Sequence, residues 1–157
     1  MKCNTHGASI GNPGPTACAC IFRNNHGESK GGFAANLGIA NALFEEIMGV
    51  ILAIEIAYYG NWDHLWIESD SKLATLALKS PIIVPWELKN RWLNCMRKLN
   101  SMQFILTHIY REDNHYADKL ANLRLTVTNF IWWQSPLVVI REDLVRNRLG
   151  LPNFRFC

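Results

Sequence analysis

A chain of 157 residues, 49% of them hydrophobic and 18% charged, has the size and composition of one globular domain and excludes a disordered chain. The net charge of +3 is too small to indicate a nucleic-acid partner by itself. Because the five cysteines form no Cys-x-x-Cys pair and no signal peptide precedes the first strand-like segment, we expect a reduced intracellular protein of the nucleus or cytoplasm.

The first part of the chain predicts a meander of three antiparallel strands. We expect these strands at Lys2–Ser9, Ala17–Arg23 and Glu28–Ala35. The dense turn signal Gly11-Asn12-Pro13-Gly14-Pro15 separates the first two strands, and Asn24-Asn25-His26-Gly27 is typical of a hairpin turn between the second and third.

Helices alternate with strands in the rest of the chain. A helix is expected at Ala42–Tyr59, and it should be buried because it is apolar on nearly every side. Its apolar stretch is too short to span a bilayer and contains Glu55, so no membrane association is expected. The remaining expected elements are a strand at His64–Ser69, helices at Ser71–Lys79 and Trp86–Asn100, a strand at Met102–Ile109, a helix at Asn114–Leu125 and a tail helix at Leu137–Asn147.

This order of elements predicts an α/β fold with a five-stranded mixed sheet flanked by helices. We expect the main domain to cover residues 1–130 and a C-terminal extension, residues 131–157, to pack on it or trail from it. The extension could provide a surface for a protein partner, and the chain is expected to be a monomer.

Three acidic residues stand where an α/β sheet places chemistry. Asp70 follows an expected strand at its carboxyl end, where open sheets bind ligands, and Glu46 and Asp118 lie in the first turns of two helices. Carboxylates from different elements can bind hard cations, and two such ions can clamp the oxygens of a phosphodiester. Each residue alone is more typical of a helix cap or a favourable helix-dipole contact, so spacing alone does not favour a metal site.

Four ordered motifs resemble type 1 ribonuclease H, and more closely the ribonuclease H-like domains of plant non-LTR retroelements and of host proteins derived from them. The motifs are the turn at 11–15 after the strand that opens Cys3-Asn4-Thr5, then Glu46-Ile47-Met48, then Glu68-Ser69-Asp70-Ser71, then Arg111-Glu112-Asp113-Asn114 with Ala117-Asp118. The resemblance covers nearly the whole chain, and the tail at residues 148–157 also resembles the ends of such plant proteins.

The resemblance implies a metal-dependent endonuclease that cuts the RNA strand of RNA–DNA hybrids with two Mg²⁺ or Mn²⁺ ions. Of the family's four metal-binding carboxylates, three carry over as Glu46, Asp70 and Asp118. The fourth, on the central strand, is His6 here, and imidazole brings no negative charge and suits Mg²⁺ poorly. We therefore expect impaired hydrolysis at this degenerate catalytic position. The alternatives are a non-catalytic hybrid- or RNA-binding module and a protein-interaction module that keeps only the fold.

The candidate nucleic-acid contacts are Asn12, Asn41, Ser71, Asn114, Lys89 and Arg91. In the family, the turn asparagine that matches Asn12 approaches the RNA minor groove, and Asn41 adjoins a helix-start position at which the family often has asparagine. Lys89 and Arg91 belong to a basic helix that either holds phosphates or simply faces solvent. The family often has a small residue at the position of Glu45.

A zinc site is the other interpretation that the early cysteines invite. Cys3 and His6 are three residues apart on a strand, so they point to opposite faces, and no zinc-ligand spacing is present. We therefore do not expect a zinc site.

Overall fold

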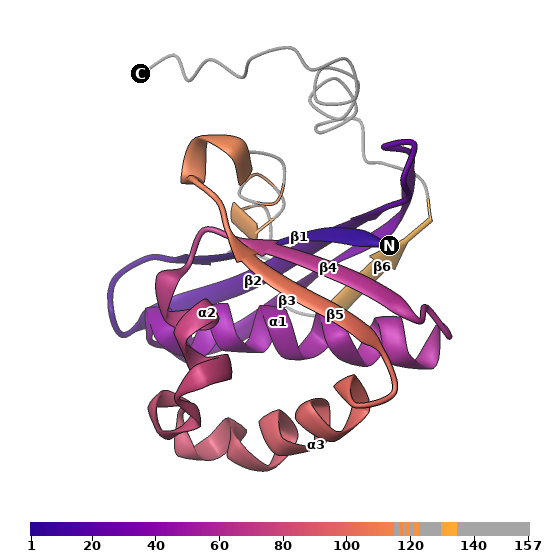
Figure 1. Cartoon of the computed structure of the whole chain (residues 1–157). Helices are drawn as coiled ribbons and strands as arrows, with labels where there is room; N and C mark the ends of the chain where they lie inside the picture. The colour runs from indigo at the N-terminus through magenta and orange to yellow at the C-terminus, as the bar shows by residue number, and fades with distance from the viewer. Residues whose placement is uncertain (115–116, 118, 120, 123–129, 135–157) are drawn as a thin grey trace.

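The computed structural model describes residues 1–114, 117, 119, 121, 122 and 130–134, and shows one sheet with helices packed on it (Figure 1). The strands are β1 (Lys2–Ser9), β2 (Gly14–Arg23), β3 (Ser29–Ala40), β4 (His64–Ser69), β5 (Gln103–His108) and β6 (Phe130–Trp133). They lie in the order β5-β4-β1-β2-β3-β6. Strands β1, β2, β3 and β6 pair antiparallel, whereas β4 and β5 run parallel to β1, so the predicted mixed α/β sheet is confirmed.

The sheet has one strand more than the five that the sequence predicts. β6 pairs with β3, from Gly32 opposite Trp133 to Ala35 opposite Phe130. Two glycines of β3 make this possible, because a Cβ atom on Gly31 would lie 2.5 Å from the Trp132 ring and one on Gly32 would lie 2.9 Å from the Trp133 ring. The first residues of the expected C-terminal extension therefore belong to the sheet. The expected tail helix at 137–147 lies outside the described residues.

One long helix covers one face of the sheet. The helices are α1 (Ala42–Tyr59), α2 (Lys72–Lys79) and α3 (Lys89–Leu99), with 3-10 turns η1 (Pro81–Ile83), η2 (Trp86–Leu88) and η3 (Arg111–Asn114). α1 packs on the sheet and α3 packs on α1, on the side away from the sheet (Figure 1). The helix expected from Trp86 thus begins three residues later, after η2. No helix in the described part of the chain is long and apolar enough to cross a membrane.

Burial of both faces places polar side chains inside the protein. The larger core, between the sheet and α1, contains Cys3, Cys18 and Cys20 as free thiols. A smaller cluster on the opposite face includes Ala8, Ala19, Ile21, Ala34, Ala117 and Ala121. Alternation along β1 puts Asn4 and His6 on the same face as Ala8, and both polar side chains are buried.

Candidate functional site

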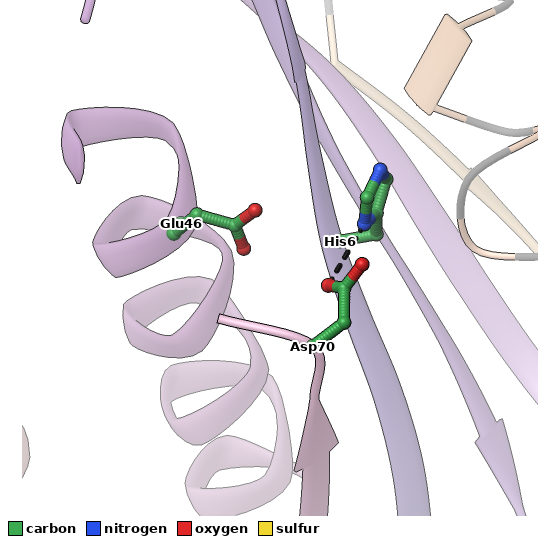
Figure 2. Close-up of side chains that lie close together, drawn as sticks. All are labelled: His6, Glu46 and Asp70. Carbon is green, nitrogen blue, oxygen red and sulfur yellow. Dashed lines mark hydrogen bonds and ion pairs between the residues drawn. The ribbon is translucent and has the colours of Figure 1, made fainter. Parts of the chain in front are cut away.

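The structure brings His6, Glu46 and Asp70 together at one end of the sheet (Figure 2). β1 and β4 are parallel neighbours with Thr5 opposite Ser69, so the residues that follow, His6 and Asp70, lie side by side. The second turn of α1 adds Glu46. One ligand atom from each residue lies within 4.8 Å of the others, and in the described part of the chain this is the one group of metal-binding residue types so close together. No cysteine belongs to it.

His6 and Asp70 form a buried hydrogen-bonded pair. The distance between His6 Nδ1 and Asp70 Oδ1 is 2.9 Å, and the two side chains are 3% and 6% exposed. Burial alone would raise the pKa of Asp70, but the hydrogen bond and charge of His6, together with a hydrogen bond from Asn114, outweigh it and lower that pKa. Asp70 is therefore ionised, and since a carboxylate only accepts hydrogen bonds, His6 Nδ1 is the donor.

Glu46 faces this pair with an unsatisfied carboxylate. Its Oε2 atom is buried and has no hydrogen-bond partner. Burial, with a further contribution from the negative charge of Asp70, raises the pKa of Glu46 to about 7, although His6, the Gly7 backbone and Arg111 oppose the shift. The carboxylate thus ionises at an energetic cost that a nearby cation would offset.

Glu45 is a second buried carboxylate, and no feature of the sequence predicted its place in the site. It is 4% exposed, and its Oε2 atom has no hydrogen-bond partner. Its side chain lies over Gly7, where a Cβ atom would clash with Glu45 Cγ. Burial and the charge of Glu46 raise the pKa of Glu45 to about 7. A glutamate in a first helical turn is ordinarily explained by the helix dipole, so only the missing side chain at position 7 could have indicated its burial.

These side chains line a hollow of about 410 Å³. Its charged walls are His6, Glu45, Glu46, Asp70 and Arg111. The N-terminal residues of α1, Ala42 and Leu43, form part of its rim, which places the hollow at the start of that helix. Asp118, the other expected ligand, lies outside the described residues.

The donor set of the hollow fits one divalent cation. Glu46 Oε2 lacks a partner, and the ligand atoms of His6, Glu46 and Asp70 are close enough to meet on one ion. A pair of Mg²⁺ ions fits less well, because Mg²⁺ prefers oxygen ligands and His6 offers nitrogen while its ring occupies Asp70 Oδ1.

Three of the expected nucleic-acid contacts cap helices near the hollow. Asn12 Oδ1 accepts a hydrogen bond from the Ala42 backbone N–H at 3.2 Å. Asn41 is the N-cap of α1 and Ser71 that of α2. Asn12 and Asn41 are both exposed. Since each uses its side-chain oxygen in a cap, the amide NH₂ groups are the atoms that a ligand would meet.

The structure corrects the expectations for Asn114 and Arg91. Asn114 is fully buried, and its Nδ2 donates to Thr5 O at 2.7 Å and to Asp70 Oδ1 at 3.3 Å, so it orients Asp70 and does not face a nucleic acid. Arg91 donates two hydrogen bonds to Glu55, the shorter 2.6 Å, and so ties α3 to α1. Lys89 is exposed at the start of α3.

Comparison with known proteins gives one consistent family. A sequence model described as reverse transcriptase-like matches residues 4–124. An Arabidopsis thaliana protein named as a candidate ribonuclease H protein is 32% identical over 129 residues, which cover 82% of this chain and 21% of the relative. This chain therefore spans about a fifth of that relative's length.

Two solved structures share the fold. Ribonuclease H1 of Halobacterium salinarum is 27% identical, with a TM-score of 0.70 over 79% of this chain and 96% of that one. LC11 ribonuclease H1, isolated from compost and solved with an RNA/DNA hybrid, is 23% identical, with a TM-score of 0.67 over 78% and 94% of the two chains. The second likeness shows the fold alone.

Proposed function

Because this chain belongs to the reverse transcriptase-like family and is a ribonuclease H-like domain, we propose that it binds RNA–DNA hybrids over the hollow of His6, Glu46 and Asp70, with hydrolysis of the RNA strand impaired by His6. The observation that carries this proposal is the convergence of the three side chains from β1, α1 and the end of β4. The ribonuclease H name of the Arabidopsis relative and the hybrid bound to LC11 ribonuclease H1 support the substrate class.

The chain's own residues hold the parts of such a reaction centre. Glu46 and Asp70, with His6, would hold a divalent cation, Mg²⁺ or Mn²⁺, which when bound polarises a phosphoryl oxygen and acidifies water. Asn114 Nδ2 donates a hydrogen bond to Asp70 Oδ1 and so helps to orient that carboxylate. Asn12 and Asn41 are exposed at the start of α1, where their amide groups would meet the hydroxyl and base edges of a hybrid minor groove.

His6 weakens this centre in two ways. It brings no negative charge to offset that of a cation, and it holds Asp70 Oδ1 in a hydrogen bond. Replacing a carboxylate ligand by imidazole removes on the order of several kcal/mol of metal-dependent stabilisation, and each ~1.4 kcal/mol is a tenfold change in rate. Mn²⁺ accepts imidazole more readily than Mg²⁺ does, so residual cleavage should favour Mn²⁺.

Hybrid cleavage by the chain and by His6→Asp tests the proposal. We expect cleavage near background for the chain in Mg²⁺ and an increase of roughly 100-fold or more for His6→Asp, because the aspartate restores an oxygen ligand and a negative charge. Asp70→Asn in the His6→Asp background should abolish the gain. Equal cleavage by the chain and His6→Asp in Mg²⁺ would contradict the proposed impairment and identify a working ribonuclease H.

A non-catalytic hybrid-binding module is the second candidate. The hydrogen bond between His6 Nδ1 and Asp70 Oδ1 favours it, because that bond pairs the two residues without an ion. This candidate requires hybrid binding that is unchanged by chelation and cleavage that stays at background even in Mn²⁺. Measurement of binding and cleavage on the same labelled hybrid separates it from the impaired enzyme.

A further inference from the structure

Glu45 is a buried carboxyl group that the proposed centre does not yet use. The carboxylate is 4% exposed, its Oε2 atom has no hydrogen-bond partner, and it lines the same hollow as His6, Glu46 and Asp70. Burying a carboxylate without a partner costs several kcal/mol, so such groups in native proteins are normally paired or bound to a metal ion.

The missing side chain at Gly7 leaves the space that Glu45 occupies. Glu45 Cδ and Oε1 lie 2.9 and 3.0 Å from the position that a Cβ atom on Gly7 would occupy, so any other residue at position 7 would displace the carboxylate. Gly7 follows His6 directly on β1. Glu45 therefore lies against the segment of β1 that carries His6.

We propose that Glu45 is a cation-binding residue of this centre, which together with Glu46 holds a divalent ion in the hollow beside the His6–Asp70 pair. This inference rests on the proposed metal centre and extends it. The group of His6, Glu46 and Asp70 offers a cation two carboxylates and a neutral ring. Glu45 lines the same hollow and would add a third carboxylate. The added charge strengthens attraction for a hard divalent ion in a region of low dielectric constant.

Arg111 is the competing partner for Glu45. It lines the same hollow, and its positive charge favours the ionised form of Glu45. If Glu45 served only to pair with Arg111, its removal would change the stability of the fold and leave cation affinity as it was. Cation binding is therefore the readout that separates the two roles.

The test measures Mn²⁺ binding to the chain without nucleic acid. The electron paramagnetic resonance signal of the free ion reports how much Mn²⁺ remains unbound. We expect Glu45→Gln to weaken Mn²⁺ binding about tenfold or more and Glu46→Gln to weaken it at least as much. Glu87→Gln is the matched control, since Glu87 is exposed on η2 and does not line the hollow. Should Glu45→Gln fail to fold by circular dichroism, Glu45→Met keeps the volume without the charge and takes its place.

The outcomes separate this inference from the proposed function. If Glu45→Gln binds Mn²⁺ like the parent chain while Glu46→Gln does not, Glu45 is no ligand and the proposed centre stands. If the parent chain itself binds no Mn²⁺, both the role of Glu45 and the metal centre are overturned, and hybrid binding remains to be judged by its own assay. A loss confined to Glu45→Gln and Glu46→Gln supports the inference.

Discussion

His6 places a hydrogen-bond donor, its Nδ1–H group, at a position where a metal site is expected to have a ligand atom with a free lone pair. The ring binds the oxygen that Asn114 also contacts, so Asp70 is held from two sides. Glu45 and Glu46 stay across the hollow with unsatisfied oxygens. The Asp70 carboxylate is thus hydrogen-bonded, whereas Glu45 and Glu46 each keep one buried oxygen without a hydrogen-bond partner. This difference affects the stability of the fold.

The free energy of unfolding should depend on pH in a direction set by these two glutamates. Their pKa values are raised to about 7 in the fold from an ordinary value of 4.5, so the folded chain binds more protons than the unfolded chain between these pH values. A raised pKa stabilises the fold fully below the unfolded value, and that contribution is lost as pH rises through about 7. We therefore expect the chain in chelator to unfold at a higher urea concentration at pH 5.5 than at pH 8.

The variant Glu45→Gln gives the control for this pH dependence, because it removes one of the two titrating groups and should reduce the difference between the two pH values. Asp70 does not interfere, since its pKa is lowered and its effect on stability begins below its ordinary value of 3.8. If the parent chain were equally or more stable at pH 8 than at pH 5.5, the fold would not raise the pKa values of the two glutamates.

The candidate ligands could be predicted from sequence, but their surroundings could not. Glu46 and Asp70 stand in motifs with a fixed order, and parallel pairing of β1 with β4 brings Asp70 to His6. Glu45 was treated as a departure from the family pattern, because its burial depends on space above Gly7, 38 positions away in the chain. The sequence predicts Asn114 as a nucleic-acid contact, because nothing local shows that its amide reaches Thr5 O.

At the scale of elements, the addition of β6 to the sheet depends on the glycines of β3. Gly31 has φ of +129°, and its missing side chain leaves space for the Trp132 ring. The local run Phe-Ile-Trp-Trp has high strand propensity, but its partner strand lies about 100 residues earlier, which is why the sequence predicted a five-stranded sheet. In contrast, α1 and the first three strands follow from local periodicity and turn signals. The bounds of β1 and α1 match the prediction, whereas β2 begins three residues earlier and β3 ends five residues later than predicted.

Gly31→Ala should destabilise the fold through two separable effects. The substitution strains a left-handed backbone, which costs about 1–3 kcal/mol, and it also forces the Trp132 ring away from β3. Gly38→Ala is a matched control, because Gly38 has φ of +73° and no atom within 4 Å of its Cβ position. We expect Gly31→Ala to lower the melting temperature more than Gly38→Ala and to shift tryptophan fluorescence to the red. Equal losses for the two variants would show that β6 contributes little to stability.

At the scale of the whole molecule, the main core and the candidate site lie at different parts of the sheet. α1 lies on one face of the sheet with α3 packed behind it (Figure 1), and both contribute to the main core. The hollow is lined by residues from the start of α1, the second half of β1 and the turn after β4. Arg91 and Lys89 lie on the same helix, α3, but in different environments. Arg91 is engaged by Glu55 across the helix interface, whereas Lys89 is exposed. The charges of Arg91 and Glu55 cancel each other within the net charge of +3, so this pair offers no excess positive charge to a phosphate backbone.

Hybrid binding should accordingly be weak, dependent on salt, and sensitive to Lys89 rather than Arg91. Each lysine that contacts a phosphate releases counterions, so affinity measured across a salt series falls linearly on logarithmic axes, and loss of one such contact reduces the slope by about 1. We expect Lys89→Ala to reduce the slope in this way with little change in stability. Arg91→Ala should leave the slope nearly unchanged but lower the melting temperature, because Glu55 loses its partner. If Arg91→Ala and not Lys89→Ala reduced the slope of affinity against salt concentration, the ion pair between Arg91 and Glu55 would have to open to bind the hybrid. A flat response to salt, or equal affinity for hybrid, duplex DNA and duplex RNA, would argue instead for a domain that keeps the fold for a protein partner.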